Sequence, residues 1–150
     1  TTLPEFARGL ITHSQDYLLG SINSTEWWDA VAVGDLAVFT PSNNDYLGLF
    51  NVTARSFELI NVGGAATRQT LAFSSGTAVG DLVVFAPLNS DSIGIFNVSS
   101  QSFDRIDITA TISGSWKFSG ATTVGDFAVF SPLGADAVGI FHVPTRSFEV

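Results

Sequence analysis

Val79-Gly80-Asp81-Leu82-Val83-Val84-Phe85 is the stretch that decides the fold, because close copies of it occur three times along the chain. The first copy is Val33-Gly34-Asp35-Leu36-Ala37-Val38-Phe39, and the third is Val124-Gly125-Asp126-Phe127-Ala128-Val129-Phe130. Successive copies begin 46 and then 45 residues apart. A period between about 20 and 50 residues is typical of stacked or ring-shaped architectures built from one supersecondary unit.

Each unit is predicted to contain four short β-strands. The Gly80-Asp81 corner indicates a tight hairpin turn, since glycine takes the positive φ that such turns require. Residues 72–79 and 82–85 would then be the first two strands. Residues 86–91 form a turn-rich loop that leads into a third strand at 93–98. Residues 103–108 alternate between polar and apolar side chains, as expected of a half-exposed fourth strand.

The residues around these corners carry a resemblance to a known family. Trp116-Lys117-Phe118-Ser119-Gly120-Ala121-Thr122-Thr123-Val124-Gly125-Asp126 and the copies quoted above resemble tandem β-propeller repeats, Kelch-like in character, of the form "KFxGAAxVGDxVVFAPxNADxVGxFDVxTxSF". The resemblance covers residues 27–150 and implies propeller blades. Residues 1–25 match the repeat poorly, so we predict an atypical cap or linker there, or a strand that completes another unit. One domain of three units at about 26–62, 63–108 and 109–150 would follow.

The number of units limits the possible architectures. Propellers have about four to eight blades, so three blades need a partner, a second copy or a longer assembly to close a ring. The alternative is a β-trefoil, which also contains three four-stranded units. The Gln-x-Trp signature usual in trefoils is missing here, and the sequence therefore favours a partial propeller.

Composition and charge exclude several classes of function. Six basic and fourteen acidic residues give a formal charge of −8, which disfavours nucleic acid and anionic membranes as partners. No apolar run is long enough for a membrane helix. The absence of cysteine removes disulfides and thiolate sites, and we predict no cofactor. Sequons at Asn23, Asn51 and Asn97 weakly favour a secreted or lumenal protein.

Two groups of residues are candidates for binding a ligand or partner. Side chains that break the repeat form the first group, because packing symmetry does not require them: Trp27, Trp28, Asp29, Trp116 and Lys117. Tryptophan is common at interface hot spots and also stacks on sugar rings. The second group lies in equivalent loops: Asn43, Asp45, Asn89, Asp91 and Asp136. For both groups, a purely structural role in packing or in turns is the competing interpretation.

The sequence therefore predicts a non-catalytic protein-interaction or assembly module. The expected partner is another protein or a second copy, as a homodimer that closes a six-bladed ring or as a subunit of a larger complex. A lectin-like carbohydrate-binding module is the alternative. An enzyme would need a convergent, non-repeated set of acid, base or nucleophile, and the sequence has no obvious one. No metal site is predicted.

Overall fold

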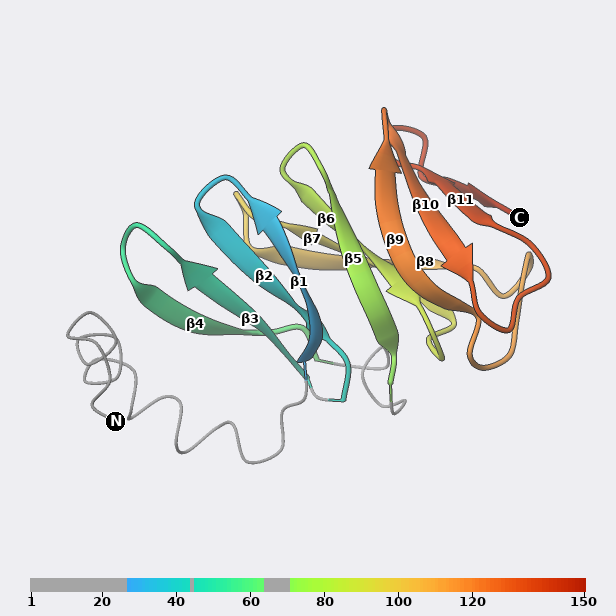
Figure 1. Ribbon diagram of the computed structural model, residues 1–150, viewed down its shortest axis with the longest axis horizontal. Coiled ribbons are helices and arrows are strands. Elements are labelled where there is room, and N and C mark those ends of the chain that lie inside the picture. Colours follow the sequence, from blue (N-terminus) through green and yellow to red (C-terminus); the bar gives the residue numbers. More distant parts are fainter. Residues whose placement is uncertain (1–26, 44, 64–70) are drawn as a thin grey trace, which may run out of the picture.

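The computed structural model describes residues 27–43, 45–63 and 71–150, and this part of the chain folds into twelve β-strands in three antiparallel sheets (Figure 1). Blade 1 contains β1 (Trp27–Val33), β2 (Leu36–Pro41), β3 (Tyr46–Asn51) and β4 (Ser56–Asn61). Blade 2 contains β5 (Phe73–Val79), β6 (Leu82–Pro87), β7 (Ser92–Asn97) and β8 (Ser102–Asp107). Blade 3 contains β9 (Phe118–Val124), β10 (Phe127–Pro132), β11 (Gly139–His142) and β12 (Ser147–Glu149). The prediction of three four-stranded units is confirmed.

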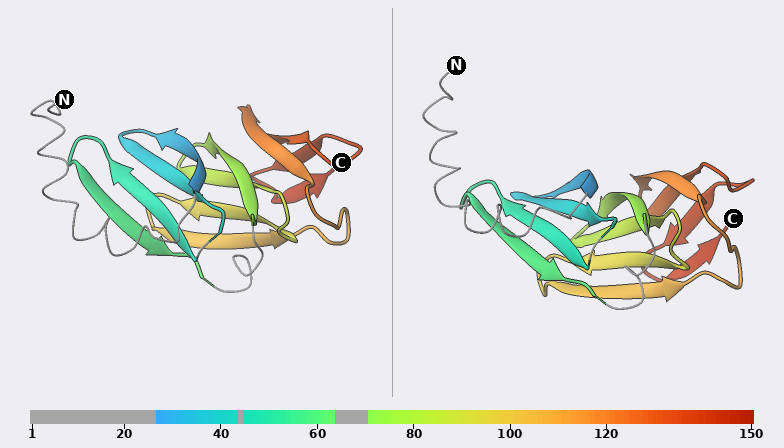
Figure 2. Two further views of the ribbon diagram at one scale, coloured as in Figure 1. Left: turned by 60° about the horizontal axis from the view of Figure 1, so that its bottom comes forward. Right: turned by 90° about the horizontal axis from the view of Figure 1, so that it is seen from below.

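The three blades lie side by side in chain order, and each sheet is a simple meander (Figures 1 and 2). The first strands pack on one another, β1 on β5 and β5 on β9. This stack of separate sheets corresponds to the predicted propeller blades and not to the trefoil alternative. The predicted cap at 1–25 lies outside the described residues. Within the described ranges, no helix is long and apolar enough to cross a lipid bilayer.

The Gly-Asp corners join the first two strands of every blade. Gly34, Gly80 and Gly125 have φ angles of 55°, 58° and 57°, so the predicted left-handed turn is confirmed. The carboxylate of Asp81 accepts a hydrogen bond from the Ser99 hydroxyl at 3.2 Å, across to the turn after β7. In the same way, the carboxylate of Asp35 accepts a hydrogen bond of 2.8 Å from the Thr53 hydroxyl. The acids of the first two corners thus stabilise the turns at that end of their blades.

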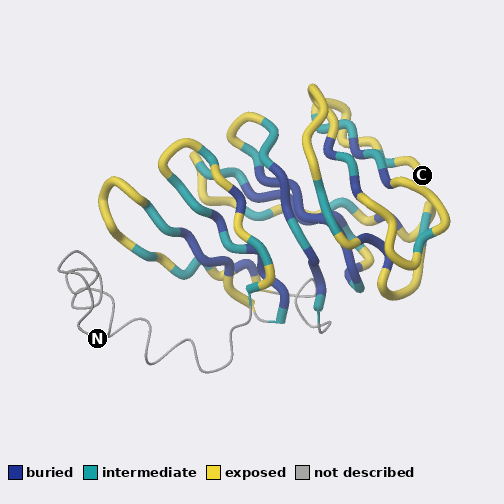
Figure 3. The backbone as a smooth tube through the Cα atoms, in the orientation of Figure 1, coloured by how far each residue is buried: buried dark blue, intermediate teal, exposed yellow. Residues whose placement is uncertain are grey.

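The apolar core is divided between the two junctions that separate the blades. We call the face of a blade that packs on the following blade its leading face, and the face that packs on the preceding blade its trailing face. Leading faces present aliphatic side chains, such as Val38, Leu47 and Leu49 in blade 1, and Val84, Ile93 and Ile95 in blade 2. Trailing faces present phenylalanines, including Phe73 and Phe85 in blade 2 and Phe118 and Phe130 in blade 3. Only blade 2 has both faces covered by other described blades, and it is the most deeply buried (Figure 3).

Polar contacts repeat at the two junctions as well. The side-chain oxygen of Asn43 accepts a hydrogen bond from Leu71 N–H at 2.8 Å, and that of Asn89 accepts one from Trp116 N–H at 2.9 Å. Each asparagine therefore holds the start of the following blade. Gly134 occupies the equivalent place in blade 3, so this blade has no side chain to form such a contact.

Candidate functional site on the leading face of blade 3

The leading face of blade 3 exposes positions that are buried in the other blades. Val138 is 44% exposed, whereas its equivalent in blade 2, Ile93, is fully buried at 0%. Leu133 is 55% exposed, whereas the equivalent Leu88 is 1% exposed. Ile93 lies in the core between blades 2 and 3, whereas Val138 is exposed to solvent at the equivalent position of blade 3. Soluble proteins rarely leave large apolar surfaces exposed, so this face is a candidate interaction site.

Strand register places two rows of side chains on this face. Phe127 pairs with His142, which pairs with Ser147, while Val129 pairs with Ile140. Ile140 in turn pairs with Glu149, so this carboxylate lies on the same face as the aliphatic side chains, since directly opposed residues in an antiparallel sheet point the same way.

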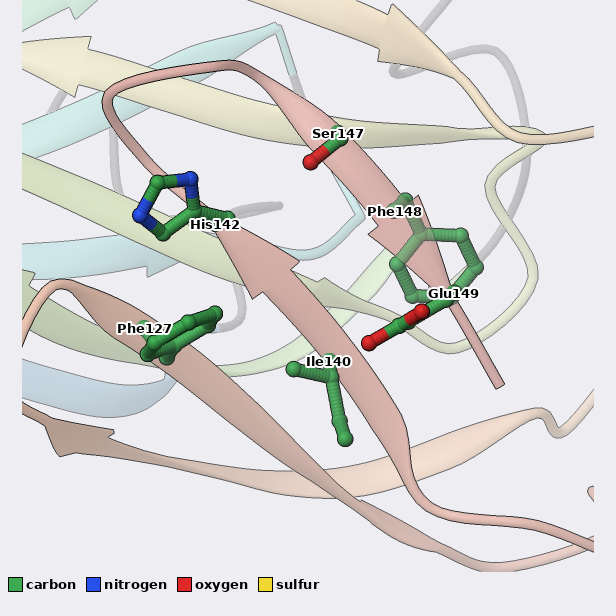
Figure 4. Close-up of a pocket in the computed structure, with 6 residues that line it drawn as sticks. All are labelled: Phe127, Ile140, His142, Ser147, Phe148 and Glu149. Carbon is green, nitrogen blue, oxygen red and sulfur yellow. The ribbon is translucent and has the colours of Figure 1, made fainter.

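A shallow hollow of about 240 Å³ lies on blade 3 (Figure 4). Its lining residues come from β10, β11 and β12: Phe127, Ile140, His142, Ser147, Phe148 and Glu149. The rings of Phe127 and His142 are 4.6 Å apart between centroids. The hollow therefore combines an aromatic pair with one carboxylate at its rim.

A chain of hydrogen bonds runs from this histidine into the adjacent turn. His142 Nδ1 lies 2.7 Å from the Thr145 hydroxyl, which lies 2.8 Å from the Ser147 hydroxyl. A histidine beside hydroxyls is the arrangement that activates a nucleophile in hydrolases. However, Ser100 and Ser102 form the same hydroxyl pair in blade 2 at 2.7 Å, in a turn without histidine. The hydroxyl pair is therefore a feature of the repeated turn.

The structure places the three predicted residues of β1 in different surroundings. Trp27 packs its ring against Phe39 and Phe57, with centroids 5.6 and 5.8 Å away. The Asp29 carboxylate accepts a hydrogen bond of 2.7 Å from the Ser75 hydroxyl of blade 2, so it belongs to the junction between blades 1 and 2. Of the three side chains, only Trp28 is largely exposed, at 50%.

Trp116 and Lys117 directly precede β9, the first strand of blade 3. The Trp116 side chain is 49% exposed. Lys117 is buried, and its ammonium donates a hydrogen bond to the Gly114 carbonyl. Burial lowers the pKa of Lys117, and the negative charge of Asp91 acts in the opposite direction. Lys117 therefore belongs to the junction between blades 2 and 3.

The predicted loop residues divide between junctions and the surface. Asn43 and Asn89 are the asparagines that hold the following blade. The backbone carbonyls of Asp45 and Asp91 accept hydrogen bonds from Val62 and Ile108 N–H at 2.8 and 3.0 Å. Asp136 is exposed in the loop before β11. Nowhere in the described ranges do three acidic or histidine side chains gather as metal ligands.

The residues of the open leading face were missed at the level of sequence. Phe127, Val138 and Ile140 match the apolar pattern of the repeat, so the pattern predicts ordinary core positions for them. The signal that was present is the repeat itself, because these three residues are equivalent to Leu82, Ile93 and Ile95, which pack in the junction between blades 2 and 3.

Comparison with known proteins identifies solved structures with a similar fold. No family model matches the chain, and no curated protein does. The chain is similar to hydrazine synthase of Kuenenia stuttgartiensis, with 11% identity, a TM-score of 0.66, and coverage of 84% of this chain and 35% of that one. It is similar to the WD40 repeats of RRP9, with 10% identity, a TM-score of 0.62, and coverage of 82% of this chain and 36% of that chain. It is also similar to a europium-containing methanol dehydrogenase, with 9% identity, a TM-score of 0.56, and coverage of 83% of this chain and 25% of that chain.

These similarities, at such low identity, establish the fold alone: the three sheets are blades of a β-propeller. The chain spans between a quarter and just over a third of the length of these structures. The Kelch-like character of the repeat stays a prediction.

Proposed function

We propose that this chain is a non-catalytic protein-interaction module that binds through the leading face of blade 3. The observation that carries the proposal is the exposure of Val138, at 44%, at a position whose equivalent in blade 2, Ile93, is fully buried in the junction with blade 3. The similar folds include both WD40 repeats and enzymes, so the proposal rests on this face and not on likeness of fold.

The chemistry of the face fits a protein partner. Val124, Phe127 and Val138 supply apolar area, and their equivalents on the leading faces of blades 1 and 2 pack, buried or partly buried, in the junctions with the next blade. A partner that presents an aromatic sheet face therefore satisfies the same packing requirements. The hydroxyls of Thr145 and Ser147 are accounted for by the repeated turn, which favours binding over nucleophilic catalysis at His142.

Photo-crosslinking tests the proposal directly. A benzophenone amino acid replaces Val138 on the open face or, as a control, Ala110, which is exposed in the connection between blades 2 and 3. Each chain is illuminated alone and in an extract of its source cells, and adducts are mapped by mass spectrometry. We expect adducts from position 138 that map to an apolar strand of an identified protein. Equal yields from both positions would contradict the proposal.

A lectin-like module is the second candidate, and the exposed indoles of Trp28 and Trp116 favour it. The two indoles lie on different blades, so each would stack on a sugar separately. Binding on a glycan array that is lost in Trp28→Ala, with the Val138 crosslinks absent, would support the lectin over the interaction module.

A further inference from the structure

The two junctions inside the chain are built alike, and this repeat defines what an additional junction requires. In each, the aliphatic leading face of one blade packs on the aromatic trailing face of the next. The chain also carries one leading face and one trailing face without a described blade against it. These are the leading face of blade 3 and the trailing face of blade 1.

The trailing face of blade 1 has the same aromatic arrangement as the faces that are already covered. Trp27, Phe39 and Phe57 form a triangle with centroid separations of 5.6, 5.8 and 6.0 Å. The corresponding triangle in blade 2, formed by Phe73, Phe85 and Phe103, has separations of 5.8, 6.3 and 6.2 Å. Blade 1 thus holds its aromatic rings in the arrangement that a leading face packs against elsewhere in this fold.

Each internal junction also has a polar contact between outer hairpins. At the first, the Gln101 amide donates to the Glu58 carboxylate of blade 1 at 3.4 Å. At the second, the Arg146 guanidinium forms an ion pair with the Asp104 carboxylate of blade 2. The donors occupy the same left-handed turn position, with φ angles of 54° and 55°. The acceptors occupy the same position on the fourth strand, opposite Ile95 in blade 2 and opposite Leu49 in blade 1.

The two open faces carry opposite charges at these positions. Arg55 is the equivalent of Gln101 and Arg146 in blade 1, with a φ of 53°, and its side chain is exposed. Glu149 is the equivalent of Glu58 and Asp104 in blade 3, where it pairs with Ile140 and is exposed on the leading face. Among the described residues, the ion pair that the structure shows joins Arg146 to Asp104 and includes neither Arg55 nor Glu149. An aliphatic leading face with an acid and an aromatic trailing face with an arginine are complementary in side-chain type and in charge.

We propose that the occupant of the blade 3 face is a second copy of this chain, joined head to tail by an Arg55–Glu149 ion pair. This inference rests on the proposed function and names its partner. Two copies supply two such contacts, because each chain gives blade 3 to one contact and blade 1 to the other. Six blades then close a ring with two-fold symmetry, within the usual range for propellers, and closure leaves no face open for further growth.

Charge exchange in the purified 150-residue chain tests this arrangement. Glu149→Arg and Arg55→Glu each place like charges across both contacts, and we expect either change to raise the dimer dissociation constant at least about tenfold. An equimolar mixture of the two variants should regain the parental dimer, since both contacts of the mixed pair then join opposite charges. Arg105 is an exposed arginine of blade 2, so Arg105→Glu is the control and should leave dimerisation unchanged.

Sedimentation velocity across a dilution series measures these equilibria, and circular dichroism verifies that every variant is folded. A parental chain that is monomeric at all concentrations would overturn the inference, as would a mixture that fails to dimerise. An effect of Glu149→Arg alone would indicate contact between two blade 3 faces and would also overturn it. Species larger than two copies would refute the closed ring. If adducts from position 138 map to a different protein while the purified chain is monomeric, the inference fails and the proposed function stands.

Discussion

Leu88 and Leu133 provide an internal comparison of one residue type in two environments. They are equivalent positions of blades 2 and 3, and their backbones form equivalent hydrogen bonds. Leu88 N–H donates to the backbone carbonyl of Ala72 at 2.9 Å, and Leu133 N–H donates to the backbone carbonyl of Lys117 at 3.0 Å. Their side chains differ in burial, since Leu88 is 1% exposed and Leu133 is 55% exposed. We therefore expect Leu88→Ala to cost much more stability than Leu133→Ala.

The size of the difference follows from burial. A fully buried leucine that is truncated to alanine loses its transfer free energy and leaves a cavity, which together cost about 2–5 kcal/mol. A side chain that is half exposed loses less contact and leaves no closed cavity, so its truncation should cost less than about 1 kcal/mol. The expected gap between the two variants is roughly 2 kcal/mol.

Urea unfolding followed by circular dichroism measures both costs. The proteins are compared at a concentration where sedimentation shows only monomer, because association would stabilise the folded chain by mass action. If the two costs agree within about 0.5 kcal/mol, Leu133 is covered in the folded monomer, and the reasoning from its exposure is refuted.

The same structure supports three further predictions. Gly80→Val should cost roughly 1–3 kcal/mol in urea unfolding, because valine is strained at the observed φ of 58°, and an unchanged midpoint would contradict this. Asn89→Ala should cost about 0.5–2 kcal/mol because Trp116 N–H loses its acceptor, whereas Asn89→Asp keeps an acceptor and should cost less. Burial lowers the pKa of Lys117 in the folded chain below its ordinary 10.5. Between the folded and the unfolded pKa, the unfolded chain binds more protons, so stability rises with pH in that interval. Lys117→Met should lose that rise, and parallel melting-temperature profiles of variant and parent from pH 7 to about pH 10 would refute the assignment.

The repeat, the number of strands and the turns could be predicted from the sequence because they depend on local chemistry. The Gly80-Asp81 corner needs a residue that tolerates positive φ, and this need is visible in two adjacent letters. Alternation along β8 and the polar loop after Pro87 are likewise short-range patterns. The period then copies each assignment into the other units, which is why the three blades were predictable as a set.

The roles of the candidate site residues depended on neighbours in another blade. Asn43 and Asn89 were expected in loops, but their partners, Leu71 and Trp116, lie 28 and 27 residues further along the chain. The carboxylate of Asp29 is bound by Ser75, 46 residues away. No short-range pattern records these contacts, because they arise only when one blade is stacked on another.

The sequence by itself determined that this protein is built from three β-sheet units with glycine corners, since local backbone preferences and alternation are enough for that. Only the tertiary structure decided which face of each blade is covered. Ile93 and Val138 are equivalent apolar residues in the repeat, yet one is buried at 0% and the other is 44% exposed. Burial is a property of the neighbouring blade, and blade 3 has no following blade among the described residues.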